Sequence, residues 1–173
     1  RCNIIQDNDS FKRNINIYIV SEDEKKRLVN HTQTLEDNLI TWLTNYKMIN
    51  DTIDILPAKI VNFGIEYSVI GDLRINKYDV LSNINDTLQR FFERTYDIGE
   101  SLVISDIVKI INNIPGVTDT INIKITNKFT AGYSDVRFEI SDAISADGRH
   151  IFVPPDYILE MKNPGDDIVG TIK

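Results

Sequence analysis

The sequence has very few of the residues that build metal centres and nucleophilic catalytic sites. It contains one cysteine, Cys2, and two histidines, His31 and His150, among 173 residues. A single cysteine excludes an intrachain disulfide, and three scattered Cys and His residues lack the ligand spacing of a structural zinc site. Neither histidine lies in a recognisable nucleophile motif, so a catalytic triad has no support. We expect His31 to be a surface residue rather than a metal ligand.

Glycine-rich phosphate motifs and basic tracks are also missing. The eight glycines form neither a phosphate loop nor a dinucleotide fingerprint. The formal net charge of −7 argues against a protein that binds nucleic acid electrostatically. The one basic run, 25–27, directly follows the acidic run 22–24, which is typical of a solvated helical face.

No apolar run approaches the roughly 20 residues of a membrane helix, and no signal peptide is visible. Hydrophobic content of 42% and charged content of 26% are ordinary for a globular protein. The length suits one domain with an extension, or two small domains. Because the chain begins with Arg1 rather than Met, we expect a domain of a longer protein.

The stretch 60–94 is the segment around which the rest of the predicted fold is arranged. From Phe63 to Val69 apolar and polar residues alternate, which indicates a strand with one buried face. Within 76–94, Val80, Ile84 and Leu88 recur at helical spacing, and Asn76 is a suitable N-cap. A strand followed by an amphipathic helix is half of a sheet-and-helix layer.

The flanking segments extend this layer. We predict a linker or arm over 1–14, a strand over 15–20 and an edge strand over 53–56, before Pro57. Ser21 and Glu24 have the spacing of a capping box, which predicts a helix start, and helical periodicity is clearest over 35–46. Ser105 and Asp106 can cap a further helix, and a strand follows at 121–125.

The C-terminal part, 127–173, carries turn signals and no helical stripe. Asp147-Gly148 is a hairpin signal. We therefore predict an α+β fold, with a mixed sheet of about four strands and two or three helices mainly on one face. The predicted organisation is a linker or arm (1–14), an α+β core domain (15–126) and a β-rich extension (127–173) that packs on the core or on a partner.

Paired carboxylates are the remaining catalytic option. A carboxylate-dependent hydrolase or metal enzyme would need clustered acidic residues to converge in one pocket; the candidates are Asp51, Asp54, Asp166 and Asp167. Asp166 and Asp167 follow a Pro-Gly turn, and turn formation explains them better than catalysis.

Aromatic residues suggest a third class of function. Trp42, Tyr46, Phe91 and Phe92 lie in helical stripes, so core packing is the favoured interpretation. A ligand- or carbohydrate-binding module would instead expose Trp42 and Tyr46 as a platform. The apolar stripe of 76–94 is broad enough for part of it to face a partner. The candidate subunit-interface residues are Leu81, Phe92, Ile151, Phe152 and Tyr157.

The order of these segments resembles the C-terminal region of T-even-type phage baseplate wedge subunits and the wider baseplate J-like family. The resemblance covers about 14–172. It rests on the segments NINIYIVSED (14–23), LEDNLITWLTNYKMINDTIDIL (35–56), IVNFGIEYSVIGDLRINKYDVLSNINDTLQRFF (60–92), SLVISDIVKIINNIPGVTDTINIKI (101–125) and FVPPDYILEMKNPGDDIVGTI (152–172).

The resemblance implies a structural virion protein of the contractile tail, without a catalytic motif. It implies an oligomer that contacts other copies of itself and other wedge subunits in the ring around the hub. We expect no enzyme activity, cofactor, metal, nucleic acid, membrane or small-molecule substrate. The implied location is the tail baseplate of the virion, with the host cytoplasm during assembly.

Overall fold

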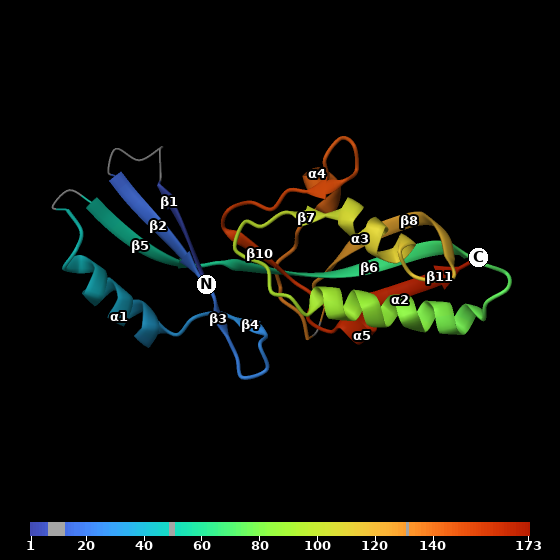
Figure 1. Cartoon of the computed structure of the whole chain (residues 1–173). Coiled ribbons are helices and arrows are strands. Elements are labelled where there is room, and N and C mark those ends of the chain that lie inside the picture. Colours follow the sequence, from blue (N-terminus) through green and yellow to red (C-terminus); the bar gives the residue numbers. More distant parts are fainter. Residues whose placement is uncertain (7–12, 49–50, 131) are drawn as a thin grey trace.

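The computed structural model describes residues 1–6, 13–48, 51–130 and 132–173. It contains two main β-sheets, and the predicted α+β class is confirmed. Strand β5 (Asp51–Pro57) belongs to the first sheet, and after Ala58 the chain enters β6 (Lys59–Gly71), the central strand of the second. Figure 1 shows the two strands following one another along the length of the molecule.

The first sheet has the order β1-β2-β5. Strand β1 (Cys2–Gln6) pairs antiparallel with β2 (Arg13–Ile19), and β2 pairs parallel with β5. Helix α1 (Gln33–Thr44) connects the parallel pair and packs on it through Leu39 and Leu43. The prediction of a linker over 1–14 is wrong for Cys2–Gln6, because this segment pairs with β2 along its whole length. Residues 7–12 of the predicted linker lie outside the described part.

The helix predicted to start at Ser21 is wrong. Ser21–Glu22 forms β3, which pairs antiparallel with β4 (Leu28–Val29). Asp23 explains the difference, because its Oδ1 accepts hydrogen bonds from the backbone N–H groups of Lys25 and Arg27, both at 2.8 Å. Such local bonds stabilise a turn at the expense of a helix.

The second sheet is built around β6. Strand β8 (Val117–Lys128) pairs antiparallel with one edge of β6. The other edge pairs parallel with β10 (Tyr157–Glu160) and, farther along, with β11 (Ile168–Ile172). The short helix α5 (Pro164–Asp167) separates β10 from β11. The predicted C-terminal extension thus contributes two strands to the central sheet.

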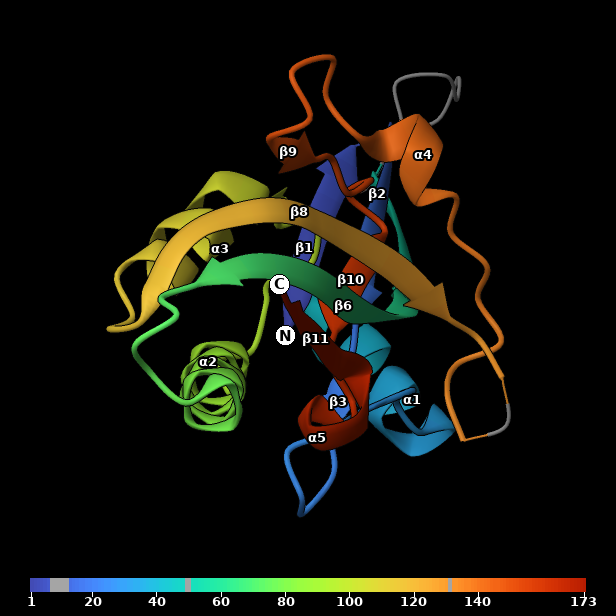
Figure 2. The same cartoon turned by 90° about the vertical axis from the view of Figure 1, so that its right-hand side faces the viewer.

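Two helices cover one face of this sheet (Figure 2). Helix α2 (Lys77–Phe92) begins at Asn76, whose side chain accepts a hydrogen bond of 3.1 Å from the backbone N–H of Tyr78, as the sequence predicts. Helix α3 (Ile104–Asn112) begins one residue before Ser105, and neither Ser105 nor Asp106 caps it. The fully buried residues between helices and sheet include Val61, Ile65, Val69, Ile84, Leu88, Ile107 and Ile111.

Three small elements complete the fold. Strands β7 (Leu102–Val103) and β9 (His150–Ile151) pair antiparallel, and α4 (Ile140–Ala143) lies near β9 (Figure 2). Gly148, in the predicted hairpin turn, has a φ of +69°, which glycine adopts without strain. Within the described ranges, no helix is long and apolar enough to cross a membrane.

Candidate protein-binding surfaces

The candidate interface residues occupy different environments. Phe92 and Ile151 are 4% and 1% exposed, so both belong to the core and offer no surface to a partner. Leu81 and Tyr157 are half-buried against the same core. Phe152 alone is prominent, with 60% exposure. Ile151 in β9 and Phe152 directly after it therefore point in opposite directions, because successive side chains of an extended chain alternate.

The structure does not bring the four candidate carboxylates together. Asp51 and Asp54 lie on β5 in the first sheet and are three residues apart, which places them on opposite faces. Asp166 and Asp167 lie in α5, beside the second sheet. Asp167 is 1% exposed and accepts hydrogen bonds from the Tyr133 hydroxyl (2.7 Å) and the Asn163 N–H (2.9 Å), so its role is structural.

Metal-ligating residues do not cluster in the part of the chain that the structure describes: no group of three or more His, Cys, Asp or Glu residues could hold an ion there. The prediction of a surface position for His31 is wrong. Its side chain is 5% exposed, and Nε2 lies 3.3 Å from Glu36 Oε2. Glu36 lies in the first turn of α1, which follows His31 in the sequence.

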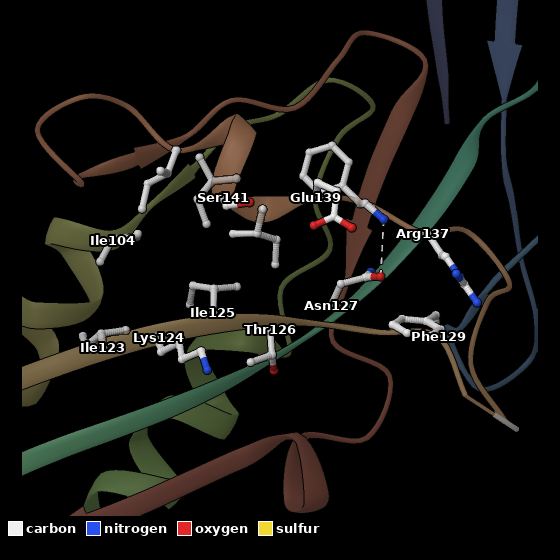
Figure 3. A pocket seen from close by; sticks show the side chains of 14 residues that line it. Ile104, Ile123, Lys124, Ile125, Thr126, Asn127, Phe129, Arg137, Glu139 and Ser141 are labelled. Carbon is white, nitrogen blue, oxygen red and sulfur yellow. Dashed lines mark hydrogen bonds between the residues drawn. The ribbon is translucent and has the colours of Figure 1, made fainter.

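A groove with a volume of about 500 Å³ lies beside β8 on the second sheet (Figure 3). Its floor is apolar. Ile123 and Ile125 come from β8, Ile104 from the start of α3, and Ile140 and Ile144 from α4 and the residue after it. Ile144 is 41% exposed, so the apolar lining is open to solvent.

The groove exposes the edge of β8 as well as one face. Five consecutive residues of this strand, 123–127, line it. Successive side chains of a strand point to opposite faces, so only a hollow along the strand edge meets all five. Strand β6 pairs with the other edge of β8, and no described strand pairs with this one. Unpaired strand edges accept a further strand.

The segment after β8 forms the outer wall of the groove. The backbone N–H of Phe138 donates a hydrogen bond of 3.3 Å to Asn127 Oδ1, drawn as a dashed line in Figure 3. The guanidinium of Arg137 lies 5.0 Å from the centre of the Phe129 ring. Polar side chains, including those of Glu139 and Ser141, thus surround an apolar floor. A polar rim around an apolar centre is typical of protein–protein interfaces.

A buried polar network holds this wall in place. Asn62, on β6, is 1% exposed. Its Oδ1 accepts a hydrogen bond of 2.7 Å from the Ser134 N–H, and its backbone oxygen accepts one of 3.1 Å from Asn127 Nδ2. Residues 132–139 are therefore attached to the central sheet by side-chain hydrogen bonds rather than by a strand ladder.

A second exposed apolar surface lies on the first sheet. Trp42 and Tyr46 of the α1 region are 58% and 71% exposed, and their ring centres are 4.7 Å apart. The prediction that these two residues pack in the core is thus wrong. Helix α1 packs on the three-stranded sheet through Leu39 and Leu43 instead. Ile4 of β1 pairs with Ile17 and so shares the face that α1 covers, yet it is 62% exposed. One helix leaves the β1 side of this face uncovered.

No protein-family model matches the sequence, and a search of curated proteins found no significant match.

Proposed function

We propose that this chain is a structural assembly module of a contractile phage tail baseplate wedge, and that it acts by joining protein subunits rather than by catalysis. The observation that carries the proposal is the groove beside β8, which combines an apolar floor with an open strand edge. An extended segment of a neighbouring subunit can add to β8 through backbone hydrogen bonds and place alternate apolar side chains on Ile123, Ile125 and Ile144.

The assignment to a baseplate wedge draws on the resemblance of 14–172 to T-even-type wedge subunits. Partners under this proposal are other copies of the chain and other wedge subunits, in the virion tail. The exposed surface around Trp42 supplies a second contact area, and an assembly subunit with two neighbours needs two such areas.

Amide hydrogen exchange tests whether the contact between subunits lies at the groove. We expect exchange in 121–127 and 137–144 to slow when the concentration of the protein is raised, because strand addition protects edge amides. Helix α2, away from the groove, provides an internal reference whose exchange stays constant. If amide exchange at the groove stayed unchanged while exchange elsewhere slowed, the interface would lie on another surface. That result would contradict a role of the groove in assembly.

A ligand-binding module is a second candidate, which the exposure of Trp42 and Tyr46 favours. The two ring planes are inclined by 44°, however, so they do not form one flat platform. Trp42 is the only tryptophan, and its fluorescence reports on this surface alone. A saturable change in emission with soluble oligosaccharides that is lost or much weakened in Tyr46→Ala, which keeps the fluorophore, would establish the second candidate; no change would remove it.

A further inference from the structure

A basic hollow lies where the β3–β4 hairpin meets the ends of α2 and β10. Its volume is about 480 Å³. Its lining contains five basic residues and two acidic ones, in a chain whose net charge is −7. The basic residues are Lys25, Lys26, Arg27, Arg94 and Lys162. The run 25–27, Arg94 and Lys162 come from three distant parts of the sequence, so folding brings these charges together.

The hairpin is fixed in position by its backbone. Asp23 holds the turn through the N–H groups of Lys25 and Arg27, and Lys26 has a φ of +61°. The Leu28 N–H donates a hydrogen bond of 2.7 Å to Glu160 Oε1, which attaches β4 to the end of β10. The three basic side chains of the turn are therefore presented from a defined loop beside Lys162.

The two acidic residues of the lining form no ion pair with these cations in the described part of the chain. Glu160 is occupied on both oxygens, by the Leu28 N–H and by Asn62 Nδ2, each at 2.7 Å. Arg94 pairs with Glu100 at 3.0 Å, and its guanidinium lies 4.5 Å from the centre of the Tyr96 ring. Within the described ranges the hairpin cations and Lys162 form no ion pair. These four cations are free to bind an anionic group.

Apolar side chains lie among the charges. Phe92 and Leu159 are 4% exposed, and Leu28 and Met161 are 8% exposed. Tyr96 also lines the hollow, and its buried hydroxyl has no hydrogen-bond partner among the described residues. These apolar side chains and the Tyr96 hydroxyl are buried, so the hollow offers a partner mainly its ring of cations.

We propose that this hollow is a docking site for an acidic segment of a partner protein. Charge complementarity selects the occupant. Arginine binds carboxylates with two parallel hydrogen bonds, and lysine adds a point charge. The site is distinct from the groove beside β8, and its test does not depend on that groove.

A polynucleotide fits the hollow less well. Glu22, Asp23 and Glu24 directly precede the basic turn, and Glu93 lies in the lining, so acidic residues interrupt the basic surface on both sides. Nucleic acid needs a continuous basic path along its backbone, and the net negative charge of the chain repels it. A short acidic peptide needs only the hollow itself.

Fluorescence anisotropy with labelled probes tests the site. The probes are an oligoglutamate peptide with one central leucine, an oligolysine peptide with the same leucine, and an oligothymidylate of the same charge as the first. We expect saturable binding of the oligoglutamate peptide alone, weakening as salt is raised. Arg27→Glu combined with Lys162→Glu should weaken it by at least about tenfold, whereas Lys77→Glu, outside the hollow, should leave it within about twofold.

A second double variant, with neutral side chains, keeps the test valid if the charge-reversed variant does not fold. Arg27→Gln with Lys162→Gln should give an intermediate loss of affinity with an unchanged circular dichroism spectrum. Binding of oligothymidylate as tight as that of oligoglutamate would overturn the choice of an acidic peptide. Absence of saturable oligoglutamate binding at low salt, or equal affinity in the double variants and the wild type, would overturn the site.

Discussion

The side-chain amide of Asn62 donates a hydrogen bond of 2.7 Å to Glu160 Oε2. This bond connects the central strand β6 to β10, and the other oxygen of Glu160 continues the connection to Leu28 of the β3–β4 hairpin. Asn62 Oδ1 also holds Ser134 in the wall of the groove. One buried side chain thus links both proposed binding surfaces to the core.

Replacing Asn62 should therefore lower the free energy of unfolding. In Asn62→Ala, the partly buried Glu160 Oε2 and Ser134 N–H lose their partner, and a buried polar group left unsatisfied costs about 1–3 kcal/mol. We expect a loss of about 3 kcal/mol in the free energy of unfolding, measured in urea. Asn122→Ala is the matched control, because Asn122 is exposed on β8 and its replacement should change stability by less than about 0.5 kcal/mol. Equal stability of the two variants would contradict the role of the network.

Gly64 lies on β6 where β10 gives way to β11. A Cβ atom there would lie 2.6 Å from Lys128 Cε and 2.9 Å from the backbone oxygen of Asp167. The lysine can move, but Asp167 is fixed by its bonds to Tyr133 and Asn163. We expect Gly64→Ala to lower the free energy of unfolding by about 1–3 kcal/mol.

The control for that variant is Gly165→Ala, since no atom lies within 4 Å of the added Cβ at Gly165. Its stability should stay close to that of the wild type. If Gly64→Ala were equally neutral in urea unfolding, the close approach of α5 to β6 would not exist in solution.

Stability should fall at alkaline pH. Burial raises the pKa of Tyr67 and of Tyr96 to about 12. Tyrosines of the unfolded chain ionise near 10, so above about pH 10 the unfolded state loses protons that the folded state keeps. Each tyrosine then lowers the free energy of unfolding by up to about 1.4 kcal/mol per pH unit, until pH reaches its folded pKa. Below about pH 10 the contribution is constant.

Urea unfolding between about pH 9 and pH 11.5 measures this slope. Tyr96→Phe removes one of the two buried hydroxyls and should remove about half of the tyrosine contribution to it. An identical slope in Tyr96→Phe and the wild type would show that Tyr96 does not retain its proton in the folded state.

The groove beside β8 should control self-association. Ile144→Lys places a charge on the apolar floor, where a partner strand would have to desolvate it, while the exposed side chain of the monomer remains in water. We expect the dissociation constant of the oligomer to rise by at least about tenfold, as measured by sedimentation equilibrium. Val169→Lys, on β11 and 51% exposed, is the control outside the groove. Equal effects of both variants would contradict a specific role of the groove.

The sequence predicted the elements whose local pattern matches their environment. Alternation over Phe63–Val69 and helical spacing from Val80 to Leu88 reflect one buried face each, and both elements are present. The errors have physical causes. Asp23 turns the chain where a capping box suggested a helix, and α1 exposes Trp42 because it covers only part of a three-stranded sheet.

The two proposed binding surfaces were largely beyond prediction because they depend on tertiary contacts. The groove combines β8 with residues 137–144, and the basic hollow brings Arg27 to Arg94 and Lys162. Residues 25–27 alone indicated a solvated helical face. The open edge of β8 also follows from which strands pair with β6, and local periodicity does not encode that choice.

The mass of the protein in solution, measured by sedimentation equilibrium over about a thousandfold range of concentration, tests the central claim that this chain assembles subunits. We expect a mass that rises above the 19.8 kDa of one chain towards a discrete oligomer as concentration increases. A constant mass of 19.8 kDa at every concentration would contradict self-assembly through these surfaces.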